Sequence, residues 1–169
     1  MPKITLPDGS KRDFDSAVSV LSVARDIGEG LAKATIAGKV NGIQVDSSYL
    51  IEKDAVLEIL TDTSEEGLSI IRHSTAHLMA MAIKELFPEA QITIGPVIEN
   101  GFFYDIAYQR AFTPDDLKII EERMKELSEK NFEISREEVS RDEALNLFDK
   151  LGEHYNCLLY TSDAADETT

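Results

Sequence analysis

The stretch Ile70–Phe87, IIRHSTAHLMAMAIKELF, decides how the rest of the chain is organised. It predicts an amphipathic helix that ends before Pro88, because apolar residues recur in it at helical spacing: Ile71, Leu78 and Ala82. His73 and His77 are four residues apart, so they lie on one face of that helix, beside the apolar stripe. The spacing therefore aims two imidazoles at one point, as in a metal site or a hydrolytic site.

A second stretch, Ile94–Asp105 (IGPVIENGFFYD), predicts strand, turn and strand, with the turn at residues 99–101. Gly95 ends the first strand, where a glycine lets the backbone approach a ligand closely. The hydroxyl group of Tyr104 can orient a substrate amine or hydroxyl group. Both residues also have an ordinary interpretation, with Gly95 in a turn and Tyr104 half buried in a sheet.

Residues 1–61 predict a small β-rich domain in front of these stretches. Asp8-Gly9 and Asn41-Gly42 are signals for β-hairpins, and a short helix capped by Ser22 ends at Gly28. Strands before and after this helix predict one mixed sheet with the helix packed on it, a ubiquitin-like β-grasp fold. The polar, aperiodic segment at residues 62–67 predicts a linker to the histidine helix.

Residues 68–156 predict the beginning of a second α+β domain. Thr113 caps one helix, and a capping box that begins at Ser140 caps another. A short strand at residues 132–134 is expected between them. Residues 157–169 continue no earlier pattern, so we expect a non-native or disordered tail and leave these residues out of the fold.

Composition narrows the class of protein. The chain has 169 residues, a formal net charge of −15 and one cysteine, Cys157, which excludes a disulfide framework and a multi-cysteine zinc site. The negative charge opposes non-specific binding to nucleic acid, so a contact with RNA must be local or lie elsewhere in the protein. No stretch is long and apolar enough for a transmembrane helix, and no signal-peptide core is present. We therefore expect a cytoplasmic protein without a membrane contact.

The neighbours of the histidine pair limit its chemistry. A zinc peptidase needs a glutamate directly after the first histidine, and Ser74 stands at that position, which argues against this class. His154 is the only other histidine, and nothing in the sequence brings it close. Taken alone, the pair also fits two surface histidines without a chemical role.

Arg72–His77 (RHSTAH) and Ile94–Asp105 together closely resemble the N-terminal editing domain of bacterial threonyl-tRNA synthetases. Residues 4–10 (ITLPDGS) and 38–42 (GKVNG) resemble the TGS domain that precedes it in that family, which is a β-grasp fold. The resemblance runs collinearly over residues 1–155. It implies an N-terminal fragment, in which a TGS domain is followed by a truncated editing domain of the threonyl/alanyl-tRNA synthetase type.

The resemblance implies a function. A threonyl-tRNA synthetase is a ligase that joins threonine to tRNA, and a binding pocket gains only about 1–3 kcal/mol from the methyl group that serine lacks. In the family, the editing domain therefore hydrolyses mischarged seryl-tRNA(Thr). His73 and His77 match the family's editing histidines. Tyr104 matches a residue of the pocket that holds the seryl group. Gly95, where the backbone can approach a ligand, is expected to be a second substrate-binding residue.

The resemblance also divides the expected ligands between this chain and the rest of the enzyme. We expect no cofactor and no metal on the present residues, whereas ATP and zinc belong to the family's catalytic domain, which is absent here. The expected partner is the acceptor end of tRNA(Thr) carrying serine. A homodimer is expected only for the full-length enzyme, through that absent domain.

Departures from the family pattern limit the activity that we expect. The family completes its editing site with a Cys-x-x-x-His pair and an aspartate, which would lie beyond this chain. Asn156 stands where the family has a lysine, and Cys157 lacks the neighbours of the family's cysteine. We therefore expect little or no deacylase activity from this chain alone. Three alternatives stay open: a free-standing deacylase that edits in trans, a TGS-containing regulatory binding module, and a zinc-dependent alanyl-type editing site.

Overall fold

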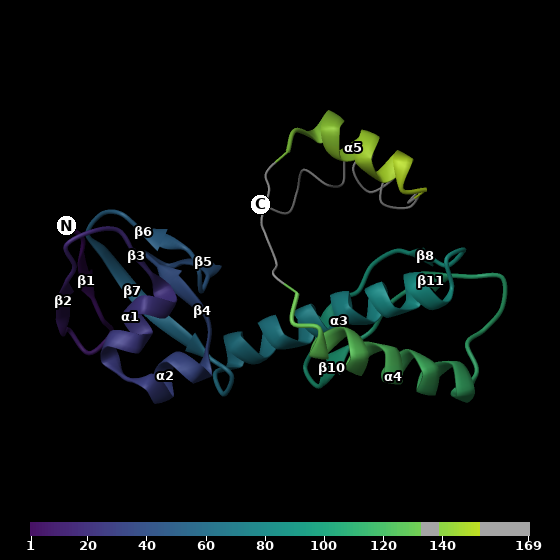
Figure 1. The fold of residues 1–169 in the computed structure, drawn as a ribbon, viewed down its shortest axis with the longest axis horizontal. Coiled ribbons are helices and arrows are strands. Elements are labelled where there is room, and N and C mark those ends of the chain that lie inside the picture. Colours follow the sequence, from purple (N-terminus) through teal and green to yellow (C-terminus); the bar gives the residue numbers. More distant parts are fainter. Residues whose placement is uncertain (133–138, 153–169) are drawn as a thin grey trace. The chain divides into compact units, whose positions relative to one another are not determined.

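The computed structural model describes residues 1–132 and 139–152 (Figure 1). The chain divides into two compact units, residues 1–72 and the residues from His73 onward. Helix α3 (Glu65–Leu86) contributes to both units, because the division falls inside it. None of the helices in the described ranges has the length and apolar character needed to cross a membrane.

The first unit is built on a five-stranded sheet in the order β2-β1-β7-β4-β5. β1 (Lys3–Thr5) pairs in parallel with β7 (Ala55–Thr61), and the other neighbours in the sheet are antiparallel. The remaining strands are β2 (Lys11–Asp13), β4 (Thr35–Val40) and β5 (Ile43–Asp46). This mixed sheet with a helix packed on it is the predicted β-grasp fold, within a chain of α+β class.

Both predicted hairpins of the first unit are present. Gly9, between β1 and β2, has a φ of 82°. Asn41 and Gly42, between β4 and β5, have φ values of 52° and 84°, and positive φ at both central residues is the turn geometry that matches the twist of paired strands. The side-chain oxygen of Asn41 also accepts a hydrogen bond of 2.9 Å from the backbone N–H of Val56, which ties this turn to β7.

Helix α1 (Val20–Ile27) packs on the sheet. Its N-cap is Ser19 rather than the predicted Ser22, since the hydroxyl group of Ser19 accepts a hydrogen bond from the backbone N–H of Ser22. Gly28 ends the helix, as predicted. A second short helix that the sequence did not predict, α2 (Glu29–Ala34), follows directly.

The core of the first unit is aliphatic, and β3 (Val18–Ser19) and β6 (Leu50–Ile51) pair antiparallel to add to it. Gly38 on β4 allows α1 to approach the sheet closely, because a Cβ atom at this position would lie 2.7 Å from a methyl group of Val20. The buried residues that form this core are Ile4, Leu6, Val18, Val20, Val23, Ile51, Ala55 and Leu57.

The connection from β7 to α3 is a tight turn that leads into helix, whereas the sequence predicted a linker over residues 62–67. The first turn of α3 already occupies residues 65–67. The hydroxyl group of Ser64 accepts a hydrogen bond from the N–H of Gly67 (3.1 Å) and donates one to the carbonyl oxygen of Thr61 (2.8 Å). A Cβ atom on Gly67 would lie 1.9 Å from that carbonyl oxygen, so only glycine fits here.

The second unit combines the greater part of α3 with an irregular hairpin and with α4 (Pro114–Glu129). The outer part of the hairpin pairs β9 (Val97–Ile98) with β10 (Gly101–Phe102), and the inner part pairs β8 (Gln91–Ile92) with β11 (Ile106–Ala107). Both pairs are antiparallel. The predicted strand, turn and strand are therefore present, although regular pairing covers only two residues in each segment.

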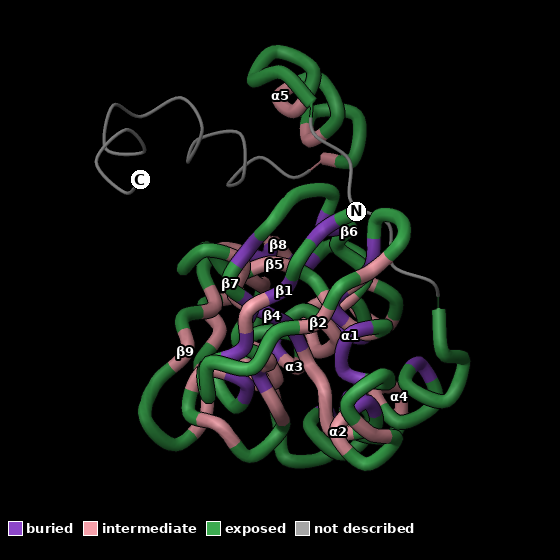
Figure 2. The backbone as a smooth tube through the Cα atoms, turned by 90° about the vertical axis from the view of Figure 1, so that its left-hand side faces the viewer, coloured by how far each residue is buried: buried purple, intermediate pink, exposed green. Residues whose placement is uncertain are grey.

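The core of the second unit lies between α3, α4 and the hairpin, and its buried residues are Ala82, Ile83, Ala90, Ile92, Ile120 and Leu127. Figure 2 colours the buried positions of the described chain purple. Of the apolar stripe predicted on α3, only Ala82 is fully buried, whereas Ile71 and Leu78 are partly exposed. Ala76 and Ile83 are buried instead, at 2% exposure each. The buried face of the helix is thus rotated from the one that the sequence predicted.

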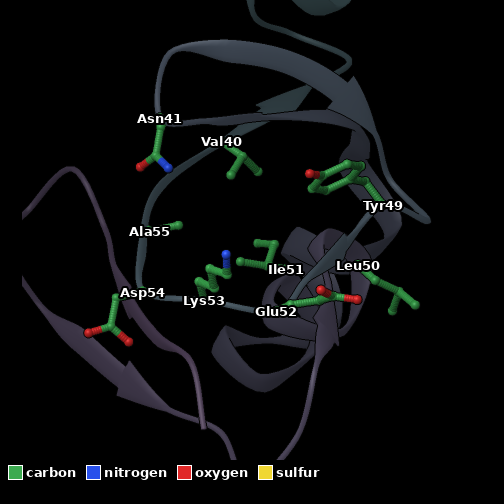
Figure 3. Close-up of a pocket in the computed structure, with 9 residues that line it drawn as sticks. All are labelled: Val40, Asn41, Tyr49, Leu50, Ile51, Glu52, Lys53, Asp54 and Ala55. Carbon is green, nitrogen blue, oxygen red and sulfur yellow. The ribbon is translucent and has the colours of Figure 1, made fainter.

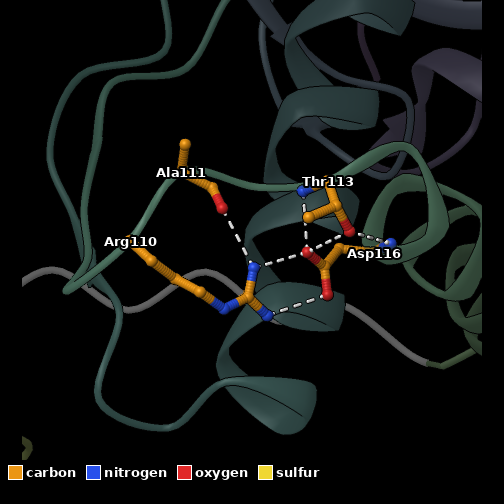
Figure 4. A network of polar contacts seen from close by, with 4 residues as sticks. All are labelled: Arg110, Ala111, Thr113 and Asp116. Carbon is orange, nitrogen blue, oxygen red and sulfur yellow. Dashed lines mark hydrogen bonds and ion pairs between the residues drawn. The ribbon is translucent and has the colours of Figure 1, made fainter.

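Helix α4 begins at the cap predicted at Thr113. The Thr113 side chain accepts a hydrogen bond from the N–H of Asp116, and the carboxylate of Asp116 accepts one of 2.7 Å from the N–H of Thr113. Both terminal nitrogens of Arg110 donate to the same carboxylate, at 2.6 and 3.0 Å (Figure 4). Arg110 is the largest cause that holds the pKa of Asp116 well below its usual range, and the hydrogen bonds from Thr113 add to it.

Helix α5 (Arg141–Lys150) begins at the predicted capping box, in which the Ser140 hydroxyl group accepts a hydrogen bond from the N–H of Glu143. The strand predicted at residues 132–134 falls largely outside the described residues. The tail predicted at residues 157–169 lies outside them entirely.

Candidate functional site

The two predicted histidines lie side by side on α3. Their Nε2 atoms are 2.9 Å apart, and their ring centroids are 4.5 Å apart with an angle of 84° between the ring planes. Both residues are exposed, while Ala76 between them is buried. A hydrogen bond between two imidazole nitrogens needs one donor and one acceptor, so the accepting ring is neutral.

The surroundings of His77 favour the neutral state of its imidazole. Partial desolvation lowers the pKa of His77, and the nearby charge of His73 lowers it further. In the contact between the two Nε2 atoms, the lone pair of the accepting ring is occupied, so Nδ1 of the neutral donating ring is the nitrogen that can accept a proton from water. The pair is therefore equipped to act as a general base on its exposed side.

Gly95 and Tyr104, the other two predicted site residues, also contact each other. They lie on opposite sides of the hairpin, and a Cβ atom built on Gly95 would lie 2.5 Å from Cε2 of Tyr104. The Tyr104 ring is partly buried and packs against the core of the second unit. Within the second unit, the structure thus brings His73 next to His77 and Gly95 next to Tyr104.

Metal ligands are a separate question. In the ranges 1–132 and 139–152, no three side chains of His, Cys, Asp or Glu are grouped closely enough to hold a metal ion. His154, Asn156 and Cys157 lie outside these ranges. The described residues therefore supply the histidine pair without further metal ligands.

A hollow of about 610 Å³ in the first unit was not predicted from the sequence (Figure 3). Val40, Leu50, Ile51 and Ala55 make the apolar part of its lining, and Tyr49 and Lys53 are among its polar residues. The lining comes from two segments, residues 40–41 and 49–55, which only the fold brings around one hollow. None of the four predicted site residues belongs to it.

Known proteins match this chain in both of its units. Residues 2–61 match the TGS domain family. Over 167 residues, or 99% of its length, the chain is 59% identical to the threonine–tRNA ligase of Saccharophagus degradans. Over the same length it is 58% identical to the enzyme of that name from Teredinibacter turnerae and 57% identical to that from Hahella chejuensis.

The chain spans about a quarter of the length of these relatives, 26% in each case. The TGS match covers the β-grasp sheet up to the end of β7, and the similarity continues through the histidine helix and the hairpin. This chain therefore carries a TGS domain in its first 61 residues and is homologous to the N-terminal region of bacterial threonine–tRNA ligases.

Proposed function

We propose that this chain is the N-terminal part of a threonine–tRNA ligase and that His73 and His77 belong to its editing site. The reaction at this site is hydrolysis of the ester bond in seryl-tRNA(Thr), which releases serine. A ligase for threonine needs such a reaction, because one methyl group supports only about 1–3 kcal/mol of discrimination in a binding pocket. Relatives named threonine–tRNA ligase match nearly the whole chain, and this similarity supports the proposal.

The observation that carries the proposal is the contact of 2.9 Å between the two Nε2 atoms. In the proposed reaction, one imidazole holds the attacking water or the terminal ribose, and the other accepts or relays the proton. The lowered pKa of His77 favours the neutral form that this role requires. Tyr104 is proposed to hold the seryl group through its hydroxyl group.

The charge of the chain agrees with a local contact to RNA. With a net charge of −15, these residues do not provide a basic surface for the body of a tRNA. We propose that they contact only the charged acceptor end, and that the rest of the ligase binds the remainder of the tRNA. ATP, zinc and the homodimer interface are assigned to that remainder too, and a cytoplasmic location follows from a role in translation.

The proposal is tested by a chimera in which this whole chain replaces the matching region of the Saccharophagus degradans ligase, with which it shares 59% identity. Hydrolysis of seryl-tRNA(Thr) and threonyl-tRNA(Thr) is then measured. We expect hydrolysis of the seryl ester only. His73→Ala and His77→Ala should each reduce the rate by about 10²-fold or more, the usual contribution of a general base.

Ser74→Ala is the matched control, since Ser74 is exposed on the same helix and has no role in the proposed reaction. Editing by the variant that lacks both histidines at the rate of the unchanged chimera would refute the proposal. The isolated 169-residue chain should hydrolyse little or no seryl-tRNA(Thr). Rapid hydrolysis by that chain would instead support a deacylase that acts in trans.

A further inference from the structure

The hairpin of the second unit changes its register next to Gly95. The backbone N–H of Thr93 donates to the carbonyl oxygen of Asp105, and the N–H of Asp105 donates to the carbonyl oxygen of Ile94. Two successive residues on one side therefore face Asp105 on the other, which is the pattern of a β-bulge. Beyond the bulge, the N–H of Phe103 donates to the carbonyl oxygen of Pro96 (3.3 Å).

Gly95 and Tyr104 form the cross-strand pair that follows this bulge. Hydrogen bonds lie on both sides of the pair, so its register is fixed. Side chains that stand opposite each other in an antiparallel pair are close enough to contact. Because Gly95 has no side chain, the ring of Tyr104 folds across the hairpin into the space that a side chain at position 95 would fill.

The distances from a Cβ atom at position 95 to the Tyr104 ring show why glycine is needed here. A Cβ atom on Gly95 would lie 2.5 Å from Cε2, 2.6 Å from Cδ2 and 3.0 Å from Cζ of Tyr104. These three atoms of one ring are the nearest neighbours of that position. The φ of Gly95 lies outside the left-handed region, in contrast to that of Gly101 in the turn, so backbone strain does not account for this glycine. The requirement for glycine therefore comes from the Tyr104 ring.

The ring has little freedom to move away. Tyr104 packs against the core cluster of the second unit, which includes Ile83 on α3 and Ile92 on β8. An added methyl group at position 95 has to displace the ring or open the hairpin, because interiors at this packing density do not absorb an extra atom without a shift. Either change moves the phenol hydroxyl group at the far end of the ring.

We propose that Gly95 is a positioning residue that sets the place of the Tyr104 hydroxyl group by admitting the ring onto the hairpin backbone. This inference rests on the proposed function, in which Tyr104 holds the seryl group. It assigns Gly95 a role that differs from direct contact with substrate. Gly95 acts through Tyr104: because it has no side chain, it determines where the Tyr104 hydroxyl group lies in the pocket.

The first arm of the test uses NMR on the full 169-residue chain. We expect the Hα protons of Gly95 to show an upfield ring-current shift that Tyr104→Leu abolishes. Gly95→Ala should move the ring resonances of Tyr104 while α4 keeps its own shifts. The matched controls are Phe103→Leu, which removes the exposed neighbouring ring, and Gly30→Ala, where an added Cβ atom meets nothing within 4 Å. Unshifted Hα protons of Gly95 in the unchanged chain would overturn the inference.

The second arm measures KM and kcat for seryl-tRNA(Thr) hydrolysis in the ligase chimera that carries this chain. We expect Gly95→Ala to raise KM by about tenfold with a smaller change in kcat, since a displaced hydroxyl group loses one hydrogen bond to the substrate. Tyr104→Leu should do the same. The double variant should be no worse than Tyr104→Leu alone, because both changes act through one ring.

The outcomes separate the inference from the proposed function. Additive effects in the double variant, or a Gly95→Ala variant with unchanged KM, would overturn the positioning role while editing itself stands. A chimera that carries the unchanged chain and hydrolyses no seryl-tRNA(Thr) would refute the proposed function. The positioning role in catalysis would fall with it, and the NMR arm would still report whether Gly95 places the ring.

Discussion

The two units of this chain bury their apolar side chains by different means. The first unit has a five-stranded sheet with α1 packed on it. Its fully buried large side chains include Ile4, Val20, Val23, Leu57 and Leu60. In the second unit Ile83 and Leu127, both on helices, are the large side chains buried to the same degree among the described residues. A two-stranded hairpin is marginal in water on its own. The hairpin of the second unit therefore depends on the helices that it packs against.

The two units also differ in exposure and in the residues proposed for chemistry. The hairpin that carries Gly95 and Tyr104 exposes large apolar side chains at Ile94, Ile98 and Phe103, by 51%, 41% and 55%. Segments with few buried contacts open more readily than the centre of a sheet. The residues proposed for editing thus lie on the less buried unit, while the better packed unit carries none of them.

The largest effect is expected in the core of the first unit. Leu57→Ala removes a fully buried side chain in the middle of the sheet and should lower the free energy of unfolding by about 2–5 kcal/mol. Urea unfolding of the full chain, followed by circular dichroism, measures this loss. Val56→Ala is the control, since Val56, the residue before Leu57 in β7, is 53% exposed and its substitution should change stability little. Equal losses for both variants would contradict the assigned faces of β7.

A somewhat smaller effect is expected where β7 turns into α3. Gly67→Ala places a Cβ atom 1.9 Å from the carbonyl oxygen of Thr61, a backbone atom that cannot rotate away. Overpacking of this kind costs about 1–3 kcal/mol. Gly30→Ala in α2 meets no neighbour and should be neutral or stabilising, because alanine favours a helix. A stable Gly67→Ala variant, measured by the same unfolding experiment, would show that the turn can open at no cost.

A third prediction concerns the different contributions of Asp116 and Asp115, at the start of α4, to stability. Asp116 has a lowered pKa in the folded chain, so its contribution is present above the ordinary pKa of 3.8 and is lost as pH falls through the folded value. Asp116→Asn should therefore destabilise the chain at pH 7 and flatten its loss of stability in acid. Asp115→Asn is the control, because the Asp115 side chain is 87% exposed. Identical pH profiles for the two variants would argue against the Arg110 contact.

The smallest effect concerns protonation of the histidine pair. The folded-state pKa of His77 is lowered from 6.5, so folding is penalised below that pH and unaffected above it, and stability should fall slightly as pH drops through the region below 6.5. An NMR titration of the imidazole nitrogens measures the pKa directly. His73→Gln should raise the pKa of His77 only in part, since desolvation is its larger cause. A complete return to the ordinary value would assign the shift to His73 alone.

Most features that depend on a few adjacent residues were predicted correctly from the sequence, although the cap of α1 is Ser19 and not the predicted Ser22. The turns at Asp8-Gly9 and Asn41-Gly42 and the caps at Thr113 and Ser140 are all present. The signals for them are local. A turn with positive φ is set by its two central residues, and the free N–H groups of a helix start are bonded by a side chain within three residues. The contact between His73 and His77 was predicted for the same reason, because helical geometry alone fixes it.

Features that depend on packing partners were missed. The buried face of α3 is rotated from the predicted one, because the hairpin and α4 decide which side of the helix is covered. Arg110 has no signal in the sequence that pairs it with Asp116. Gly95 was noticed as a glycine, but the reason for it is a tyrosine nine residues later, and only the register of the hairpin brings the two together.

The tight junction after β7 has a consequence for how such proteins can be recombined. The match to the TGS domain family ends at residue 61, whereas the compact unit extends through Arg72. An ion pair between Lys39 on β4 and Glu66 also joins the sheet to the first turn of α3. A genetic breakpoint placed at residue 61 would therefore cut inside a folded unit. An exchange that preserves the unit has to transfer the beginning of the histidine helix together with the sheet.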